Sequence, residues 1–66
     1  MDIGEARRLL KHMERPPSEG ALSRAFALKG LLEAIADCGE VDLSLGYGEC
    51  ALEAMVGGAR VTMKVE

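Results

Sequence analysis

The sequence predicts a single small α+β domain in which two helices precede a three-stranded antiparallel sheet. Three observations support this fold class. Apolar residues recur at the helical period through the first half of the chain, strict alternation of apolar and polar residues begins at Val41, and glycine-containing dipeptides suited to tight turns separate the alternating stretches. A chain of 66 residues is long enough for one domain, so residues 1–66 are assigned to it.

The first helix is predicted over residues 3–15. Asp2 stands at the N-cap position, Glu5 follows three residues later as in a capping box, and Pro16 and Pro17 end the helix. At 100° per residue, the apolar side chains fall on one face and the basic side chains on the opposite face. The basic side chains are Arg7, Arg8, Lys11, His12 and Arg15.

This basic face is either a solvated surface or a binding surface for a negatively charged partner. Arg7, Lys11 and Arg15 stand four residues apart, and such a like-charge ladder costs a helix about 0.2–0.5 kcal/mol per step. A negative partner would remove that cost. Arg7, Arg8, Lys11 and Arg15 are therefore the candidate residues for binding a partner or a nucleic acid.

The second helix is predicted over residues 19–38, with Ser18 as its N-cap and Gly39 as a left-handed C-terminal cap. Its apolar surface is too wide for a single contact, because Leu22 and Phe26 lie one turn apart outside the main apolar stripe. Either the first helix folds back over these two side chains or a partner chain covers them. Leu22 and Phe26 are therefore the candidate interface residues.

Three strands are predicted over residues 41–46, 49–56 and 59–65. Two-residue turns at Tyr47-Gly48 and Gly57-Gly58 would join them as a meander. One register then satisfies both hairpins and places the apolar side chains on one face. In this register the apolar pairs include Leu43 with Leu52, Leu45 with Cys50, Cys50 with Val65, Leu52 with Met63, Ala54 with Val61, and Val56 with Ala59.

A short helix over residues 49–56 is the alternative, because this segment consists largely of strong helix formers and Gly57 suits a C-terminal cap. The order of elements would then be ααβαβ. Only residues 46–58 are available for such a crossover, which is near the minimum length for a parallel connection, so the meander is favoured.

No residue pattern indicates catalysis, and we expect neither an enzyme nor a cofactor or metal site. Cys38 and Cys50 are too few for a disulfide scaffold, and the predicted sheet separates them by roughly 13 Å along a strand, beyond the reach of a disulfide. Both are expected as reduced thiols. His12, the single histidine, lies among cations, and "GYGEC" lacks the glycine spacing of a phosphate-binding loop.

The sequence also predicts a cytoplasmic protein without a membrane segment. No stretch reaches the 18 or so uncharged apolar residues that a span requires. Asp2 and Glu5 stand where a signal peptide would carry positive charge.

Charge is distributed unevenly along the chain. Residues 1–30 hold six basic and four acidic side chains, residues 31–66 hold two and seven, and the net charge is −3. We expect a non-enzymatic protein-interaction or regulatory module, an adaptor or inhibitor, that forms a homodimer. The alternative is a small nucleic-acid-binding regulator that uses the basic face of the first helix, although an isoelectric point near 5.1 and the lack of Asn and Gln count against it.

Overall fold

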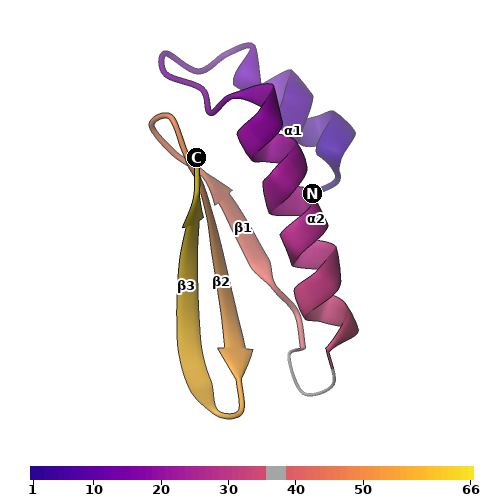
Figure 1. Ribbon diagram of the computed structural model, residues 1–66. Coiled ribbons are helices and arrows are strands. Elements are labelled where there is room, and N and C mark those ends of the chain that lie inside the picture. Colours follow the sequence, from indigo (N-terminus) through magenta and orange to yellow (C-terminus); the bar gives the residue numbers. More distant parts are fainter. Residues whose placement is uncertain (36–38) are drawn as a thin grey trace.

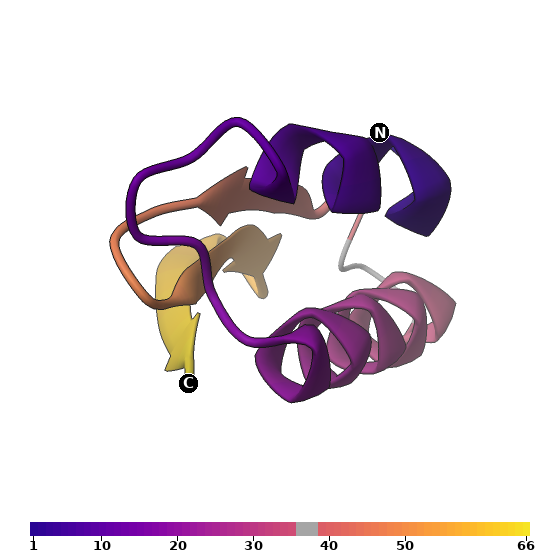
Figure 2. The same ribbon diagram turned by 90° about the horizontal axis from the view of Figure 1, so that it is seen from above.

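The computed structural model describes residues 1–35 and 39–66 and contains two helices followed by a three-stranded meander (Figure 1). The elements are α1 (Ile3–Leu10), α2 (Glu19–Ala34), β1 (Asp42–Leu45), β2 (Cys50–Val56) and β3 (Ala59–Val65). Both helices lie on the same face of the sheet, where α2 packs against β2 and β3 and α1 packs against α2 (Figure 1, Figure 2). The predicted fold class is confirmed. None of the described helices is long and apolar enough to cross a membrane.

The order of strands is β1-β2-β3, and both pairings are antiparallel with the predicted register. Gly57 and Gly58 have φ angles of 56° and 82°, the left-handed values that a two-residue hairpin turn requires at both central positions. At the other turn, the N–H of Gly46 donates a hydrogen bond to the carbonyl of Glu49 at 2.9 Å.

The alternative helix over residues 49–56 is wrong. Residues Cys50–Val56 form β2, the central strand, which pairs with β1 on one side and β3 on the other. Pairing along both edges, together with burial of Cys50, Leu52 and Ala54 on one face, outweighs the helix propensity of the individual residues.

Helix α1 ends at Leu10, five residues before the predicted end at residue 15. The backbone N–H groups of Lys11, His12 and Met13 each donate to a carbonyl three residues earlier, which is a tightened last turn and not a continuing α-helix. Pro16 disfavours helical geometry at Arg15, and neither proline has an N–H to donate to the preceding turn, so the helix could not have continued to residue 15. The predicted N-cap is confirmed, since the carboxylate of Asp2 accepts from the N–H of Glu5 at 2.8 Å.

Helix α2 begins as predicted and ends early. The hydroxyl of Ser18 accepts a hydrogen bond from the N–H of Ala21 at 3.0 Å. The helix ends at Ala34, with Ile35 already extended, so it stops short of the predicted end near residue 38; residues 36–38 themselves lie outside the described residues. Gly39 has the expected left-handed φ of 64°, but it lies five residues beyond the end of the helix and does not cap it.

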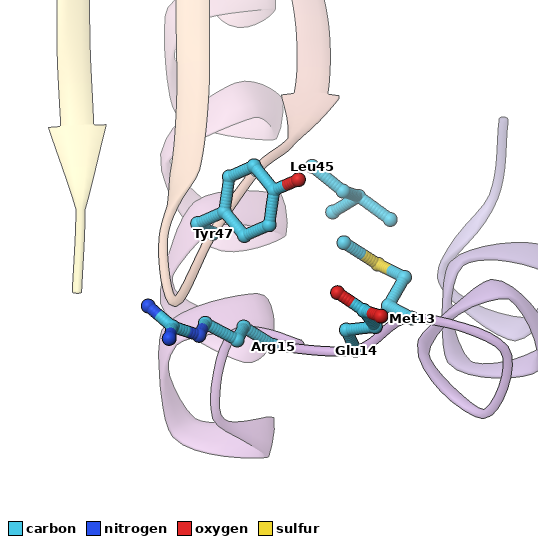
Figure 3. A pocket seen from close by; sticks show the side chains of 6 residues that line it. Met13, Glu14, Arg15, Leu45 and Tyr47 are labelled. Atoms are coloured by element: carbon cyan, nitrogen blue, oxygen red, sulfur yellow. The ribbon is translucent and has the colours of Figure 1, made fainter.

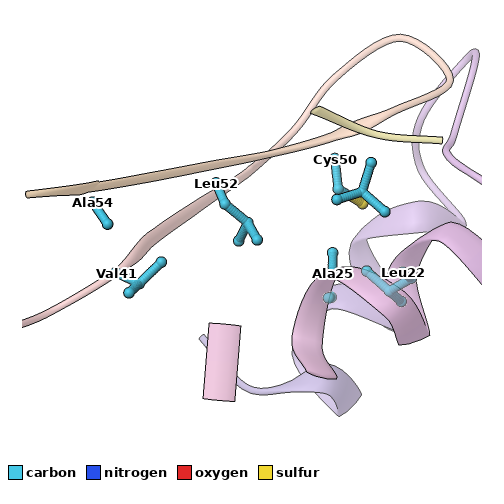
Figure 4. Close-up of a cluster of buried hydrophobic side chains, with 8 residues drawn as sticks. Leu22, Ala25, Val41, Cys50, Leu52 and Ala54 are labelled. Atoms are coloured by element: carbon cyan, nitrogen blue, oxygen red, sulfur yellow. The ribbon is translucent and has the colours of Figure 1, made fainter. Parts of the chain in front are cut away.

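The core lies between α2 and the sheet, with one contribution from α1 (Figure 4). Small residues, Ala6 of α1 and Ala25 of α2, let the helices approach closely, and Leu22 fills the space beneath Cys50 and Leu52 of β2. The buried cluster consists of Ala6, Leu22, Ala25, Val41, Cys50, Leu52, Ala54 and Val65.

Candidate functional site

Three adjoining hollows run from the outer side of α1 to the turn between β1 and β2. The first, of about 410 Å³, lies between residues 13–15 and that turn. The second, of about 440 Å³, shares Met13 and Leu45 with the first. The third, of about 340 Å³, shares Leu9 and His12 with the second. We call this continuous surface the α1–β1 groove; its lining residues are Met1, Glu5, Arg8, Leu9, His12, Met13, Glu14, Arg15, Leu45, Gly46 and Tyr47.

The segment that follows the end of α1 forms one wall of the first hollow. Because the helix stops at Leu10, residues 11–17 run across the end of the sheet and not along the helix axis. The N–H of Gly48 donates to the carbonyl of Arg15 at 2.9 Å and ties this segment to the β1–β2 turn. Gly48 has a φ of 72°, which only glycine adopts readily, so a glycine at this position permits the hydrogen bond to Arg15.

Apolar side chains line the groove but are not covered by the fold. Tyr47 is 79% exposed, Met1 52% and Leu9 50%, while Met13 and Leu45 are half-buried. Met13, Leu45 and the Tyr47 ring face one another across the first hollow (Figure 3). Apolar side chains that gather in a hollow, with an aromatic among them, are typical of sites that anchor a partner's side chains.

Charged groups stand around this apolar lining. Arg8 and His12 line one end of the groove, and Arg15 lines the other. Glu5 and Glu14 are the two acidic residues of the lining. The groove therefore offers apolar contacts between two exposed guanidinium groups.

The structure separates the four predicted basic residues. Arg8 and Arg15 line opposite ends of the groove, whereas Lys11 is the exposed C-cap residue of α1 and lines none of the three hollows. Arg7 turns toward α2, where its Nε lies 2.6 Å from Oε1 of Glu19. The last step of the predicted like-charge ladder is wrong, because Arg15 lies outside the helix that would have placed it one turn beyond Lys11.

The two predicted interface residues belong to the fold itself. Leu22 is completely buried in the core, and Phe26 is half-buried against the same cluster. Helix α1 packs against α2, as one of the two explanations for the wide apolar surface expected, but Leu22 itself lies beneath the sheet beside Cys50 (Figure 4). Leu22 therefore has no exposed surface to offer a partner in this structure.

Sequence reasoning missed the apolar part of the groove. It placed Leu9 and Met13 on the apolar face of a longer helix, and Leu45 on the core face of a strand. Leu45 does pack against the core, but Leu9 remains 50% exposed and Met13 lies beyond the end of α1. The detectable signal was Tyr47, an aromatic residue at the tip of a two-residue turn, where tertiary cover is rare.

Burial shifts the acid–base equilibrium of the Cys50 thiol. Its side chain is buried, and burial raises the pKa of the thiol by disfavouring the thiolate. A thiol with a raised pKa is a poor nucleophile.

The prediction that Cys38 and Cys50 form no disulfide involves Cys38, which lies outside the described residues. Within residues 1–35 and 39–66, no three Cys, His, Asp or Glu side chains come together in a way that could hold a metal ion.

No family model, no curated protein and no solved structure matches this chain. Its function is therefore inferred from the groove and the sheet alone.

Proposed function

We propose that the chain is a non-catalytic protein-binding module, an adaptor or inhibitor acting in the cytoplasm as a homodimer. Its α1–β1 groove takes the apolar side chains of an acidic segment of a partner protein. One observation supports this most directly: exposed Leu9, Met1 and Tyr47 lie along a continuous hollow whose ends carry Arg8 and Arg15.

The apolar lining supplies affinity. Full burial of one side chain of this size contributes roughly 1.5–3 kcal/mol. Two or three anchors seated against Leu9, Met13 and Tyr47 would be enough for a regulatory contact, since part of the gain offsets the entropy lost on association.

The two guanidinium groups supply orientation and specificity. Acidic residues on either side of an apolar anchor would meet Arg8 at one end of the groove and Arg15 at the other. Such complementarity chiefly raises the association rate and excludes basic segments. We therefore expect binding to weaken with salt but to persist at physiological ionic strength, because the apolar contacts remain.

A peptide selection tests the proposal. Two displayed libraries with the same random apolar positions, one flanked by Asp and Glu and the other by Lys, are selected on the purified protein. We expect enrichment from the acidic library only, with dissociation constants of the selected peptides rising at least tenfold in Tyr47→Ala and Leu9→Ala. Leu31→Ala is the matched control, because Leu31 is also exposed but does not line the groove.

Two outcomes would contradict this function. Enrichment from the lysine library alone would reverse the assigned charge preference. Peptides that bind Tyr47→Ala and Leu9→Ala as tightly as the unchanged protein would place the binding site elsewhere.

A nucleic-acid-binding regulator is the second candidate. One observation favours it: Tyr47 and Arg15 come from different segments and line the same hollow, so a base could stack on the ring while the guanidinium contacts a phosphate (Figure 3). The basic face of α1 would extend this surface through Arg8 and Lys11. Glu14 in the hollow and the pairing of Arg7 with Glu19 count against it.

Fluorescence anisotropy with a labelled duplex and a labelled single strand separates the two candidates. A nucleic-acid site predicts binding that falls steeply between about 50 and 200 mM salt and that is weakened by Arg8→Ala and Arg15→Ala. Absence of binding to both probes at the lower salt concentration would eliminate this candidate.

A further inference from the structure

Strand β3 forms an open edge of the sheet. The order β1-β2-β3 leaves one side of Ala59–Val65 without a neighbouring strand in the part of the chain that the structure describes. The strand has seven residues and no proline, and its only charged side chains are Arg60 and Lys64. An edge of this length with so few protective features is a template for pairing with another strand.

The register identifies the backbone groups that remain available. A two-residue turn closes on a hydrogen-bonded pair, here Val56 with Ala59, and such pairs alternate along an antiparallel ladder. Ala59, Val61, Met63 and Val65 therefore direct their N–H and C=O groups toward β2. Arg60, Thr62 and Lys64 direct theirs toward the open side.

The side chains of β3 alternate in the same way. Val61, Met63 and Val65 lie on the face that carries the core, and Val61 remains 39% exposed there. Arg60, Thr62 and Lys64 lie on the opposite face, and Glu66 continues this alternation one residue beyond the strand. The guanidinium of Arg24 in α2 donates a hydrogen bond to the backbone carbonyl of Glu66 and so fixes the end of the strand.

Charge discriminates among the registers in which this edge could pair antiparallel with a second copy. A two-fold axis through Thr62 would place Arg60 opposite Lys64 of the partner subunit, twice in each dimer. A two-fold axis through Met63 instead places Arg60 opposite Glu66 of the partner subunit, again twice. Opposite charges directly across a sheet are favourable and like charges unfavourable, so the second register is preferred.

We propose that β3 pairs with β3 of a second copy of this chain in the register with Met63 at the two-fold axis. Val61 then lies opposite Val65 of the partner subunit on the core face, and Thr62 lies opposite Lys64 of the partner subunit on the other. The two sheets join into one six-stranded sheet with all four helices on the same face.

This inference rests on the homodimeric part of the proposed function and uses a surface separate from the α1–β1 groove. A failure of the proposed dimer can therefore be told apart from a failure of peptide binding in the groove. Variants of Arg60 and Glu66 change the mass in solution and leave peptide binding intact, whereas Tyr47→Ala changes peptide binding and leaves the mass intact.

Charge reversal with rescue is the first test, read out by sedimentation or light scattering over a range of concentrations. The unchanged chain should have the mass of two copies. Arg60→Glu and Glu66→Arg, each placing like charges opposite one another twice, should each raise the dimer dissociation constant about tenfold. The double variant Arg60→Glu with Glu66→Arg should restore dimerisation.

Lys64→Glu is the matched control on the same face of the same strand. In the proposed register it faces Thr62 of the partner subunit and should leave the dissociation constant nearly unchanged. With Thr62 at the axis it would face Arg60 of the partner subunit and tighten the dimer, which would overturn the proposed register.

Cross-linking is the second test, in a Cys38→Ser background so that a disulfide through Cys38 is excluded by sequence. Met63→Cys should form a disulfide between copies under mild oxidation, because a pair at the axis has Cα atoms within bonding range. Thr62→Cys should cross-link far less. A monomeric mass at all concentrations, or preferential cross-linking of Thr62→Cys, would overturn the proposal.

Discussion

The Nε of Arg7 donates a hydrogen bond to Oε1 of Glu19 at 2.6 Å and joins α1 to the first turn of α2. Both side chains remain about half exposed, at 51% and 57%. The carboxylate also lies at the N-terminal end of a helix, where negative charge is favoured. One of the four predicted basic residues is therefore paired within the fold.

Glu19→Gln should destabilise the chain by less than about 1 kcal/mol, because exposed ion pairs contribute little. Urea denaturation followed by circular dichroism measures this change. The same variant releases the charge of Arg7, so any binding of a labelled duplex at about 50 mM salt should become tighter. Glu33→Gln is the control, because it removes a carboxylate from the same helix without releasing Arg7; Glu33 instead pairs with Lys29 at 3.0 Å. Equal effects of the two substitutions on duplex binding would mean that only net charge matters.

Leu22→Ala should reduce the free energy of unfolding by about 2–5 kcal/mol, because it removes a completely buried side chain from the centre of the core. Leu31→Ala, on the same helix but 62% exposed, should change it by less than about 0.5 kcal/mol. Urea midpoints of the two variants measure the difference. A mild effect of Leu22→Ala would contradict its burial and make it available again as an interface residue.

Two glycine substitutions should have opposite signs. Gly30 lies within α2 with open space around it, so Gly30→Ala should raise the free energy of unfolding by about 0.5–1 kcal/mol. Gly58 has a φ of 82°, so Gly58→Ala should lower it by about 1 kcal/mol or more despite equally open surroundings. Thermal melts of both variants provide the comparison. A stabilising Gly58→Ala would mean that the turn between β2 and β3 is not left-handed.

Local sequence signals predicted the sheet better than they predicted the groove. Alternation and two glycine-containing turns fix a register within a few residues, and the observed pairs from Leu43–Leu52 to Val56–Ala59 are those predicted. The apolar helical period continues to Met13, but α1 ends at Leu10, so periodicity alone does not locate the end of this helix. The contact from Gly48 to Arg15 joins segments more than thirty residues apart, which no local pattern reveals.

Stability should fall in alkaline solution through Cys50. Burial raises the pKa of its thiol in the folded chain, whereas in the unfolded chain the pKa is near the ordinary value of about 8.5. Between these two pKa values the folded state keeps a proton that the unfolded state has lost. The free energy of unfolding therefore decreases as the pH rises above about 8.5, by at most about 1.4 kcal/mol per pH unit, and does not depend on this group at lower pH.

Urea denaturation of a Cys38→Ser variant at several pH values from about 7 to 10 measures this slope. Adding Cys50→Ala lowers stability at every pH by removing a buried sulfur, but it should abolish the part of the slope that the thiol contributes. Slow alkylation of Cys50 by iodoacetamide in the folded chain, with rapid alkylation in urea, should accompany the effect because the side chain is buried. Identical slopes with and without the Cys50 thiol would show that another group controls the alkaline transition.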